Sequence, residues 1–200
     1  MEIVAATNNA GKLKELRRIL EPMGYTLLTP ADLGLNLDPE ETGTTFEANA
    51  LIKAEAFCKA AGKPVIADDS GLTVEALDGA PGVYSARYCG RHGDDEANNV
   101  KLLAELEDLE PDKRSACFVS AVCFCLPDGR HFTYMGRCPG WVGLEPVGEN
   151  GFGYDPIFYY PPFGKSLAEV SAEEKNQVSH RANALRVFYG KLKEAGYADK

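Results

Sequence analysis

Two hydrophobic periods alternate along the first third of the chain. Short apolar runs at 2–7, 25–29 and 63–69 have the length and composition of buried strands. Between them, apolar residues recur every three or four positions over 13–24, as they do on one face of a helix. The segment 44–62 is rich in Ala and charged residues and ends in Gly62, which also predicts a helix. Strands and helices that alternate in this way predict an α/β architecture, with helices layered on a sheet.

The middle of the chain is richer in strand patterns. A helical pattern over 94–109 is followed by strand patterns at 114–126, 128–142 and 155–161. The Asp-Gly pair in "PDGR" is typical of a tight hairpin turn and would join the first two of these strands as an antiparallel pair. We therefore predict a mixed sheet with a strand-rich part.

The last part of the chain contains two helix starts. Ser171 and Glu174 have the spacing of a capping box, and a helical pattern over 179–196 begins with Ser179 as its N-cap. No internal repeat or low-complexity linker divides the 200 residues. We therefore predict a single domain over 1–200, with no clean boundary in the sequence.

Composition and charge narrow the class of protein. The chain is 44% apolar and 26% charged, as ordinary globular proteins are. No apolar run approaches the roughly 20 residues that span a bilayer, and no secretory signal pattern opens the chain, so we expect a cytoplasmic protein. The formal net charge of -9 disfavours nucleic acid and anionic membranes as partners. The net charge does not exclude a small anionic substrate. Such a substrate would need a local cluster of Lys, Arg and backbone N–H groups, together with a divalent metal ion.

The cysteines give no sign of a metal site or a disulfide framework. None of the six forms a Cys-x-x-Cys pair, and the closest two lie in the apolar run "CFC". Small buried thiols are expected at these positions: Cys58, Cys89, Cys117, Cys123, Cys125 and Cys138.

The segment "TNNAGK" (7–12) joins a predicted strand to a predicted helix. Free N–H groups at a helix N-terminus attract anions, and Lys12 adds a positive charge. The segment is not a Walker A loop, because Leu13 stands where that motif has Ser or Thr. It is compatible with a phosphate loop or with an ordinary turn that caps the helix.

The stretch "VIADDSGL" (65–72) ends an apolar run with two adjacent carboxylates. Successive side chains of a strand point to opposite faces, so Asp68 and Asp69 cannot both face one ligand. We expect one of them to enter a site, because ligands bind beyond the carboxyl ends of strands in open α/β sheets. The other would accept hydrogen bonds from the protein, since an unpaired buried carboxylate is costly.

Other charged residues precede or lie on the helix predicted at 44–62. Glu40 and Glu41 would either contact a ligand or stabilise the helix dipole. Lys53 would face either a phosphate or solvent.

Two later segments are candidates for contact with a flat heterocycle. In "GFGYD" (151–155), Phe152 or Tyr154 would either stack on a base or pack on the core. The segment "SHR" (179–181) opens the last helix, close to Lys175, and would read a base carbonyl, bind a phosphate or simply cap the helix.

These segments occur together and in one order. "TNNAGK", "PEETGTTFEANA", "IADDSGLTVEALDGAPGVYSARY", "GFGYDPIF" and "SHRANAL" together resemble the inosine/xanthosine triphosphate pyrophosphatase family, from Ile3 to the last helix. The resemblance implies Mg²⁺-dependent hydrolysis of non-standard purine nucleoside triphosphates (ITP, dITP, XTP) to the monophosphate and pyrophosphate. It also implies an elongated, two-lobed α/β structure with a long mixed sheet flanked by helices, a nucleotide cleft between the lobes, and a homodimer.

The resemblance further implies roles for individual residues. Asp69 matches the catalytic base and, with Glu40, the metal ligands, while Asp68 and Glu41 would support them. Many members have Thr-Gly-Asn where this chain has Thr7-Asn8-Asn9, so the loop geometry would differ slightly. The positions that match substrate contacts are Thr7, Asn8, Asn9, Ala10, Gly11, Lys12, Lys53, Ser70, Phe152, Gly153, Tyr154, Asp155, Lys175, His180 and Arg181.

A 6-keto group distinguishes hypoxanthine and xanthine from adenine. A donor such as Arg181 or a backbone N–H would pair with that oxygen but would meet the amine of adenine. Guanine also carries the keto group, so its rejection needs another feature of the site.

Two other functions compete with this prediction. Enzymes of the septum-formation-inhibitor (Maf-like) type hydrolyse modified pyrimidine nucleotides on a similar fold, and the long match over 66–88 disfavours them. A catalytically silent nucleotide-binding protein is disfavoured by the presence of Lys12, Glu40, Asp69 and Lys175.

Overall fold

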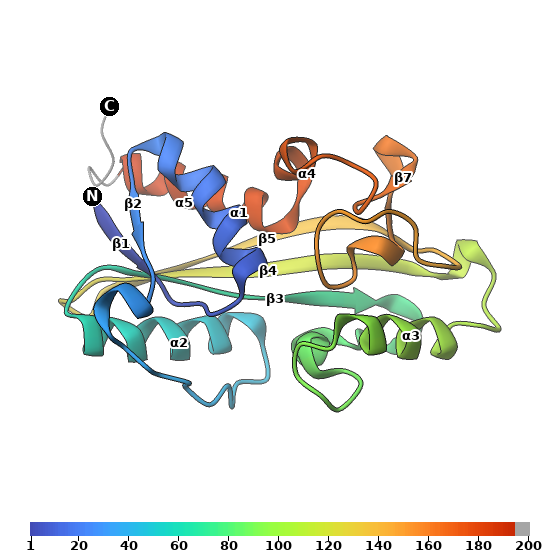
Figure 1. The fold of residues 1–200 in the computed structure, drawn as a ribbon, viewed down its shortest axis with the longest axis horizontal. Helices are drawn as coiled ribbons and strands as arrows, with labels where there is room; N and C mark the ends of the chain where they lie inside the picture. Colours follow the sequence, from blue (N-terminus) through green and yellow to red (C-terminus); the bar gives the residue numbers. More distant parts are fainter. Residues whose placement is uncertain (195–200) are drawn as a thin grey trace. The chain divides into compact units, whose positions relative to one another are not determined.

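The computed structural model describes residues 1–194, which form an α/β structure with a mixed sheet (Figure 1). The helices are α1 (Ala10–Leu20), α2 (Phe46–Ala61), α3 (Asp95–Glu105), α4 (Ala172–Val178) and α5 (His180–Glu194). The strands are β1 (Glu2–Ala5), β2 (Thr26–Leu28), β3 (Val65–Val74), β4 (Ser115–Cys125), β5 (His131–Val142), β6 (Phe158–Tyr160) and β7 (Lys165–Ser166).

The sheet has seven strands in the order β2-β1-β3-β4-β5-β6-β7. β1 pairs in parallel with β2 and with β3, whereas β6 pairs antiparallel with β5 and β7. The predicted mixed sheet is therefore confirmed.

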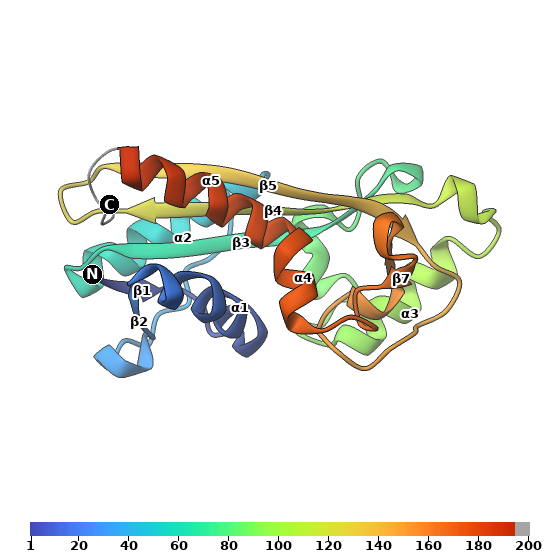
Figure 2. The same ribbon diagram turned by 90° about the horizontal axis from the view of Figure 1, so that it is seen from above.

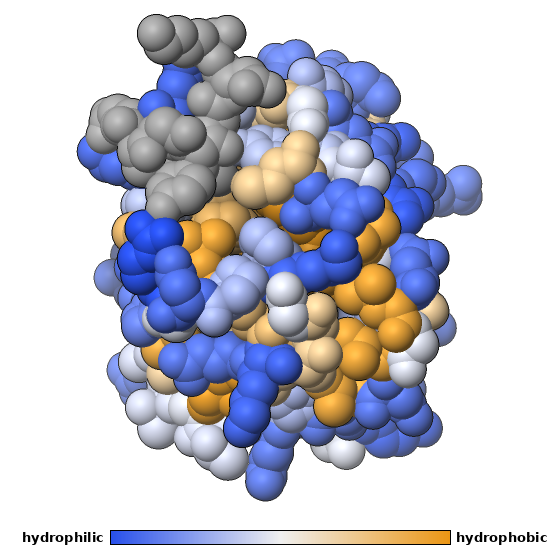
Figure 3. All heavy atoms as spheres, turned by 90° about the vertical axis from the view of Figure 1, so that its left-hand side faces the viewer, coloured by the Kyte–Doolittle hydropathy of each residue, from blue (hydrophilic) through white to orange (hydrophobic). Residues whose placement is uncertain are grey.

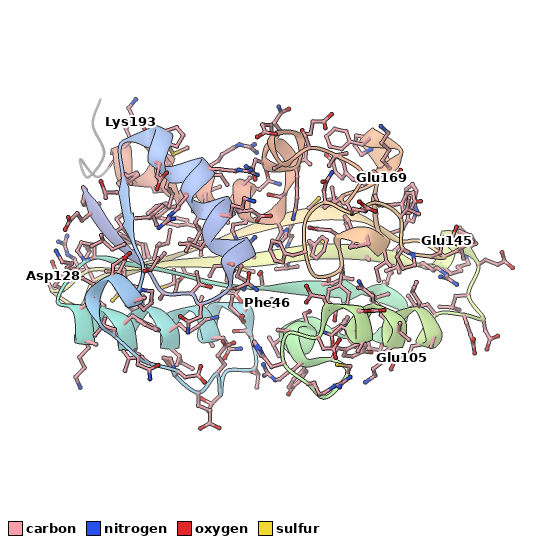
Figure 4. All side chains as sticks on the ribbon, in the orientation of Figure 1. Phe46, Glu105, Asp128, Glu145, Glu169 and Lys193 are labelled. Carbon is pink, nitrogen blue, oxygen red and sulfur yellow. The ribbon has the colours of Figure 1, made fainter. Side chains whose placement is uncertain are left out.

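Local sequence signals account for the helix ends. The side chain of Thr45 accepts a hydrogen bond from the N–H of Ala48, so α2 begins at Phe46 (Figure 4). Gly62 ends the same helix with a φ of 61°, which glycine adopts without the steric cost of a Cβ. The capping box of Ser171 and Glu174 at the start of α4 is also confirmed.

Several predicted strands have different bounds in the structure, and two of these differences involve candidate site residues. The strand expected to end at Asp69 continues as β3 to Val74, so the aspartates lie within the strand. The strand expected from Asp155 begins at Phe158, because Asp155–Ile157 forms a 3₁₀ turn with a proline in its first turn.

The chain divides into two compact units, each built from separate segments. Unit 1 comprises Met1–Asp69, Ser120–Gly136 and the chain from Arg181 onward. Unit 2 comprises Ser70–Val119 and Arg137–His180. The strands β3, β4 and β5 each contribute residues to both units.

In unit 1, α1 and α5 cover one face of the sheet and α2 covers the other (Figures 1 and 2). The main apolar cluster joins Ile3, Leu16, Phe124, Leu185 and Phe188, which come from β1, α1, β4 and α5. The face in Figure 3 is mostly hydrophilic, with smaller hydrophobic patches between the polar side chains. The hairpin predicted at "PDGR" is confirmed, since Leu126 N–H donates to the carbonyl of Arg130 around the turn that contains Asp128 (Figure 4).

Unit 2 has its own apolar cluster, which includes Leu72, Leu102, Phe118, Tyr154 and Phe158. Its helices are α3 and α4, and the short strands β6 and β7 also belong to it. Among the described residues, no helix is both long and apolar enough to cross a membrane.

Candidate active site

Strand β3 buries two adjacent aspartates that face different groups in unit 1. Asp68 is 1% exposed and Asp69 is 6% exposed. Since neighbouring side chains of a strand alternate between its faces, each carboxylate has its own set of partners. The two carboxylates are therefore described separately by the atoms that they contact.

Asp68 is surrounded by donors. Its carboxylate accepts hydrogen bonds from Arg181 at 3.2 and 3.1 Å and from Ser120 Oγ at 2.5 Å, and it pairs with Lys12 Nζ at 2.8 Å. Burial alone would raise the pKa of Asp68, but the charges of Arg181 and Lys12 outweigh it and hold this pKa well below its usual value. Asp68 is thus a fixed negative charge that organises cationic side chains.

Arg181 lies at the other end of this network. Arg181 is 1% exposed, and its guanidinium donates to both Asp68 and Glu15. Its contact with a substrate stays a prediction. Burial disfavours the charged form, but the two carboxylates outweigh this effect and raise the pKa of Arg181. Glu15, on α1, is a network member that the sequence analysis missed, because its single polar position on a helix face gives no signal of its partner.

Asp69 has a different environment. Lys53 Nζ lies 3.4 Å from its Oδ1, whereas its Oδ2 is buried with no hydrogen-bond partner among the described residues. Burial raises the pKa of Asp69, against the opposing charges of Lys53 and Lys12. An unsatisfied buried carboxylate oxygen is costly, which indicates a place for a cation or a donor.

Lys53 links Asp69 to the acidic segment before α2. Its ammonium lies 3.1 Å from Glu41 Oε1 and donates to the carbonyl of Asp68 at 2.9 Å. The side chain of Glu40 is exposed, so the structure brings Glu41 rather than Glu40 to Lys53. The assignment of Glu40 as a metal ligand stays a prediction.

Asn49 anchors this acidic segment and was not singled out from the sequence. It is fully buried on α2, and its Oδ1 accepts a hydrogen bond from Gly43 N–H at 2.8 Å. A Cβ at Gly43 would lie 2.6 Å from Asn49 Oδ1, so the close approach requires glycine. This pairing depends on the fold of the segment, and the residue types alone do not reveal it.

The first loop caps helix α1, which is one of the two interpretations that the sequence left open, and its binding of phosphate stays a prediction. Asn9 caps α1 by accepting a hydrogen bond from Lys12 N–H at 3.0 Å, and Thr7 Oγ1 accepts one from Asn9 N–H at 3.1 Å. Lys12 then extends to Asp68, and its pKa is lowered by burial although Asp68 opposes this shift. Among the described residues, Asp78 is the non-glycine residue with positive φ, so Asn8 fits this loop without strain.

In unit 2, the segment 151–155 is organised by a buried ion pair. Lys175 Nζ donates to Asp155 Oδ2 at 2.5 Å, and both side chains are almost fully buried. The same carboxylate oxygen accepts a hydrogen bond from Phe152 N–H at 2.9 Å, and Lys175 Nζ lies 4.6 Å from the centre of the Phe152 ring. Phe152, Asp155 and Lys175 thus lie together in unit 2, and their contact with a substrate stays a prediction.

The other candidate residues of unit 2 have structural partners. Tyr154 belongs to the apolar cluster and donates to the carbonyl of Ser85 at 2.8 Å, so it packs in the core. Phe152 is half-buried. His180 stacks on Phe118 with ring centroids 4.7 Å apart. Ser70, which directly follows Asp69, is half-buried.

Comparison with known proteins places this arrangement in a family. Residues 3–191 match the sequence model of the Ham1 family. The chain belongs to the Ham1 family. A dITP/XTP pyrophosphatase of Bacillus subtilis is 50% identical over 194 residues, which cover 97% of this chain and 98% of that protein. A dITP/XTP pyrophosphatase of Haemophilus influenzae is 48% identical and covers 96% of this chain and 98% of its own length.

Solved structures of Ham1 proteins have the same fold. The Ham1 protein of Staphylococcus aureus is 45% identical and superposes with a TM-score of 0.86 over 98% of this chain and 100% of that one. A HAM1 protein from Coxiella burnetii is 40% identical, with a TM-score of 0.87 over 97% and 99% of the two chains. The predicted α/β class and the family resemblance are therefore confirmed for this Ham1 protein.

Proposed function

We propose that this protein hydrolyses non-standard purine nucleoside triphosphates, namely ITP, dITP and XTP, to the nucleoside monophosphate and pyrophosphate. The observation that carries the proposal is Asp69, a buried carboxylate with one oxygen that has no hydrogen-bond partner among residues 1–194, close to Lys53 and under the influence of the Lys12 charge. The names of relatives that are about half identical, dITP/XTP pyrophosphatases, support the same class of substrate.

Lys12, Lys53 and the loop 7–12 are the proposed phosphate contacts. The ammonium groups of Lys12 and Lys53 offset charge on the triphosphate and on the departing pyrophosphate. The N–H groups of the loop 7–12, at the start of α1, provide further donors for phosphate oxygens. Asp68 contributes indirectly, because it holds Lys12 in place.

We propose Mg²⁺ as the cofactor, and the chemistry of Asp69 supports this choice. Mg²⁺ prefers carboxylate oxygens and water as ligands, and Asp69 Oδ2 is a buried carboxylate oxygen without a partner among the described residues. Glu40 and Glu41 offer further carboxylates on the neighbouring segment. When bound, the ion would offset charge on the phosphates.

Asp69 is the proposed general base. A carboxylate whose pKa is raised by burial accepts a proton more readily than an exposed aspartate does. In this role it orients a water molecule and takes its proton as the water attacks the α-phosphorus. The bond to the β-phosphate then breaks, and pyrophosphate leaves.

Phe152 is the proposed contact of the purine base. Phe152 offers a half-buried ring for stacking on the purine, whereas the ring of Tyr154 packs in the apolar cluster of unit 2. Arg181 or a backbone N–H would donate to the 6-keto oxygen. Adenine would place its amine at the same position and leave the donor unpaired.

The resemblance to the pyrophosphatase family also suggests an assembly. We propose a homodimer in the cytoplasm with a nucleotide as its small-molecule partner and no nucleic-acid partner. Analytical ultracentrifugation of the purified protein would give the mass of the assembly.

The test of the proposed function is a product assay. The protein is mixed with ITP and Mg²⁺, and pyrophosphate and orthophosphate are both measured, with ATP as the comparison substrate and EDTA as the metal-free control. Pyrophosphate formation that requires Mg²⁺ and favours ITP supports the proposal. Orthophosphate without pyrophosphate would contradict it, and tight ITP binding without turnover would identify a binding protein instead.

A further inference from the structure

Helix α3 holds the segment 151–155 through Gly153. Both the backbone N–H and the backbone carbonyl of Gly153 form hydrogen bonds with side chains of this helix. Asp95 Oδ2 accepts a hydrogen bond from Gly153 N–H at 2.8 Å, and Asn99 Nδ2 donates to the carbonyl of Gly153 at 3.1 Å. Asp95 and Asn99 are four residues apart on α3, so they lie on the same face of the helix. All of these residues belong to unit 2.

Asn99 is built into the interior of unit 2. It is 7% exposed, and its Oδ1 has no hydrogen-bond partner among the described residues, so the bond to Gly153 is the side chain's recorded polar contact. The neighbouring Asn98 is also buried, but its Oδ1 accepts a hydrogen bond from Cys89 N–H. Two adjacent buried amides of one helix thus hold different segments.

Helix α3, which carries Asp95 and Asn99, is itself firmly packed. Leu102 and Leu106 are fully buried in the apolar cluster of unit 2. A side chain on α3 therefore has a fixed reference position from which to hold a loop.

Gly153 needs such an anchor. Its φ is +62°, in the left-handed region, and glycine at this position has the greatest freedom to adopt other conformations. The residues on either side are fixed differently, since Phe152 N–H donates to Asp155 and Tyr154 donates to Ser85. The N–H of Gly153 belongs to the peptide that follows the Cα of Phe152, so its bond to Asp95 fixes the peptide plane next to the Phe152 side chain.

We propose that Asp95 and Asn99 are positioning residues for nucleoside binding: together they fix the Gly153 peptide and so orient Phe152 for the purine. The inference rests on the proposed function, because it assigns Phe152 to the base. Neither residue touches the triphosphate in this assignment. Their loss should therefore weaken binding of the nucleoside and leave binding of a bare phosphate chain unchanged.

The experiment compares a nucleotide with a ligand that lacks the nucleoside. KM and kcat for ITP, and the inhibition constant of inorganic tripolyphosphate, are measured for wild type, Asp95→Ala, Asn99→Ala, Asp95→Asn and Glu96→Ala. We expect Asp95→Ala and Asn99→Ala each to raise KM for ITP roughly five- to tenfold, as expected for loss of one hydrogen bond, with tripolyphosphate inhibition within twofold of wild type. Asp95→Asn keeps an acceptor for Gly153 N–H and should restore most of the loss.

Glu96→Ala is the matched control, because it removes a neighbouring acid from the first turn of α3 without a contact to Gly153. An unchanged KM in Asp95→Ala, or an equal loss of ITP and tripolyphosphate affinity, would overturn the inference. If Asn99→Ala does not fold, as judged by circular dichroism, Asp95→Ala and Asp95→Asn still decide, since Asp95 is exposed. A wild-type protein without pyrophosphate release from ITP would instead refute the proposed function.

Discussion

Asp68 and Asp69 are neighbours in β3 with opposite electrostatic balance. Asp68 accepts hydrogen bonds from Arg181 and Ser120 and has a pKa well below normal, because nearby cations outweigh its burial. Asp69 has a raised pKa, because burial outweighs its more distant lysine, and one of its oxygens lacks a partner among the described residues. A carboxylate whose pKa is lower in the folded than in the unfolded protein stabilises the folded state at neutral pH. A carboxylate whose pKa is raised on folding destabilises it, because its charged form is unfavourable there.

Substitution should separate these two roles. We expect Asp69→Asn to lower kcat for ITP by roughly 100-fold or more, as loss of a general base does, with little loss of stability. Asp68→Asn should lower the free energy of unfolding by about 3 kcal/mol, because it leaves the buried Arg181 with less counter-charge. Urea unfolding and steady-state kinetics of both variants measure the split. Equal stability losses in the two variants would contradict this division.

The sequence predicted this division only in part. Strand alternation correctly separated Asp68 from Asp69, since it depends on the backbone period alone. It did not identify Arg181 as the principal partner of Asp68, because the two residues are 113 positions apart and meet only through the fold. Glu15 was missed for the same reason.

At the level of secondary-structure elements, the site depends on the contact between α2 and the acidic segment that precedes it. Thr45 and Gly62, the helix ends, follow from local residue types and were predictable. The hydrogen bond from Gly43 to Asn49 is different, because it depends on how the segment turns back onto the first turns of α2. This bond sets the course of the segment that carries Glu41 to Lys53.

We therefore expect Gly43→Ala to disturb that segment. The new Cβ would lie 2.6 Å from Asn49 Oδ1 and 2.7 Å from the Cβ of Ala48, so something must shift. Loss of stability of about 1–3 kcal/mol is typical of such overpacking, and kcat/KM for ITP should fall as Glu41 is displaced. Gly190→Ala on α5 is the control, since nothing lies within 4 Å of its new Cβ, and it should be neutral or slightly stabilising. Identical behaviour of the two variants would refute the anchoring role.

At the level of the whole chain, two apolar clusters form from segments that alternate along the sequence. The α/β class was predictable, because hydrophobic periods reveal strands and helices one at a time. The division into units was not marked by any linker, because β3, β4 and β5 pass from one unit to the other within single strands. The hydrophobic period of a strand does not indicate at which residue its side chains leave one apolar cluster and enter the other.

Cysteine reactivity offers a test of how these units unfold. Burial raises the pKa of Cys123 to about 11 and that of Cys138 to about 12, so both thiols stay protonated and shielded in the folded protein. Cys123 reports on unit 1 and Cys138 on unit 2. In the native protein at neutral pH, we expect a thiol reagent to label the half-buried Cys89 and Cys117 first.

With increasing urea, Cys123 and Cys138 should become reactive at the same midpoint, because continuous strands connect the two cores and make their unfolding cooperative. Mass spectrometry after pulse labelling identifies the modified thiols at each urea concentration. Two separate midpoints would show that each unit is stable by itself and that the shared strands do not couple them.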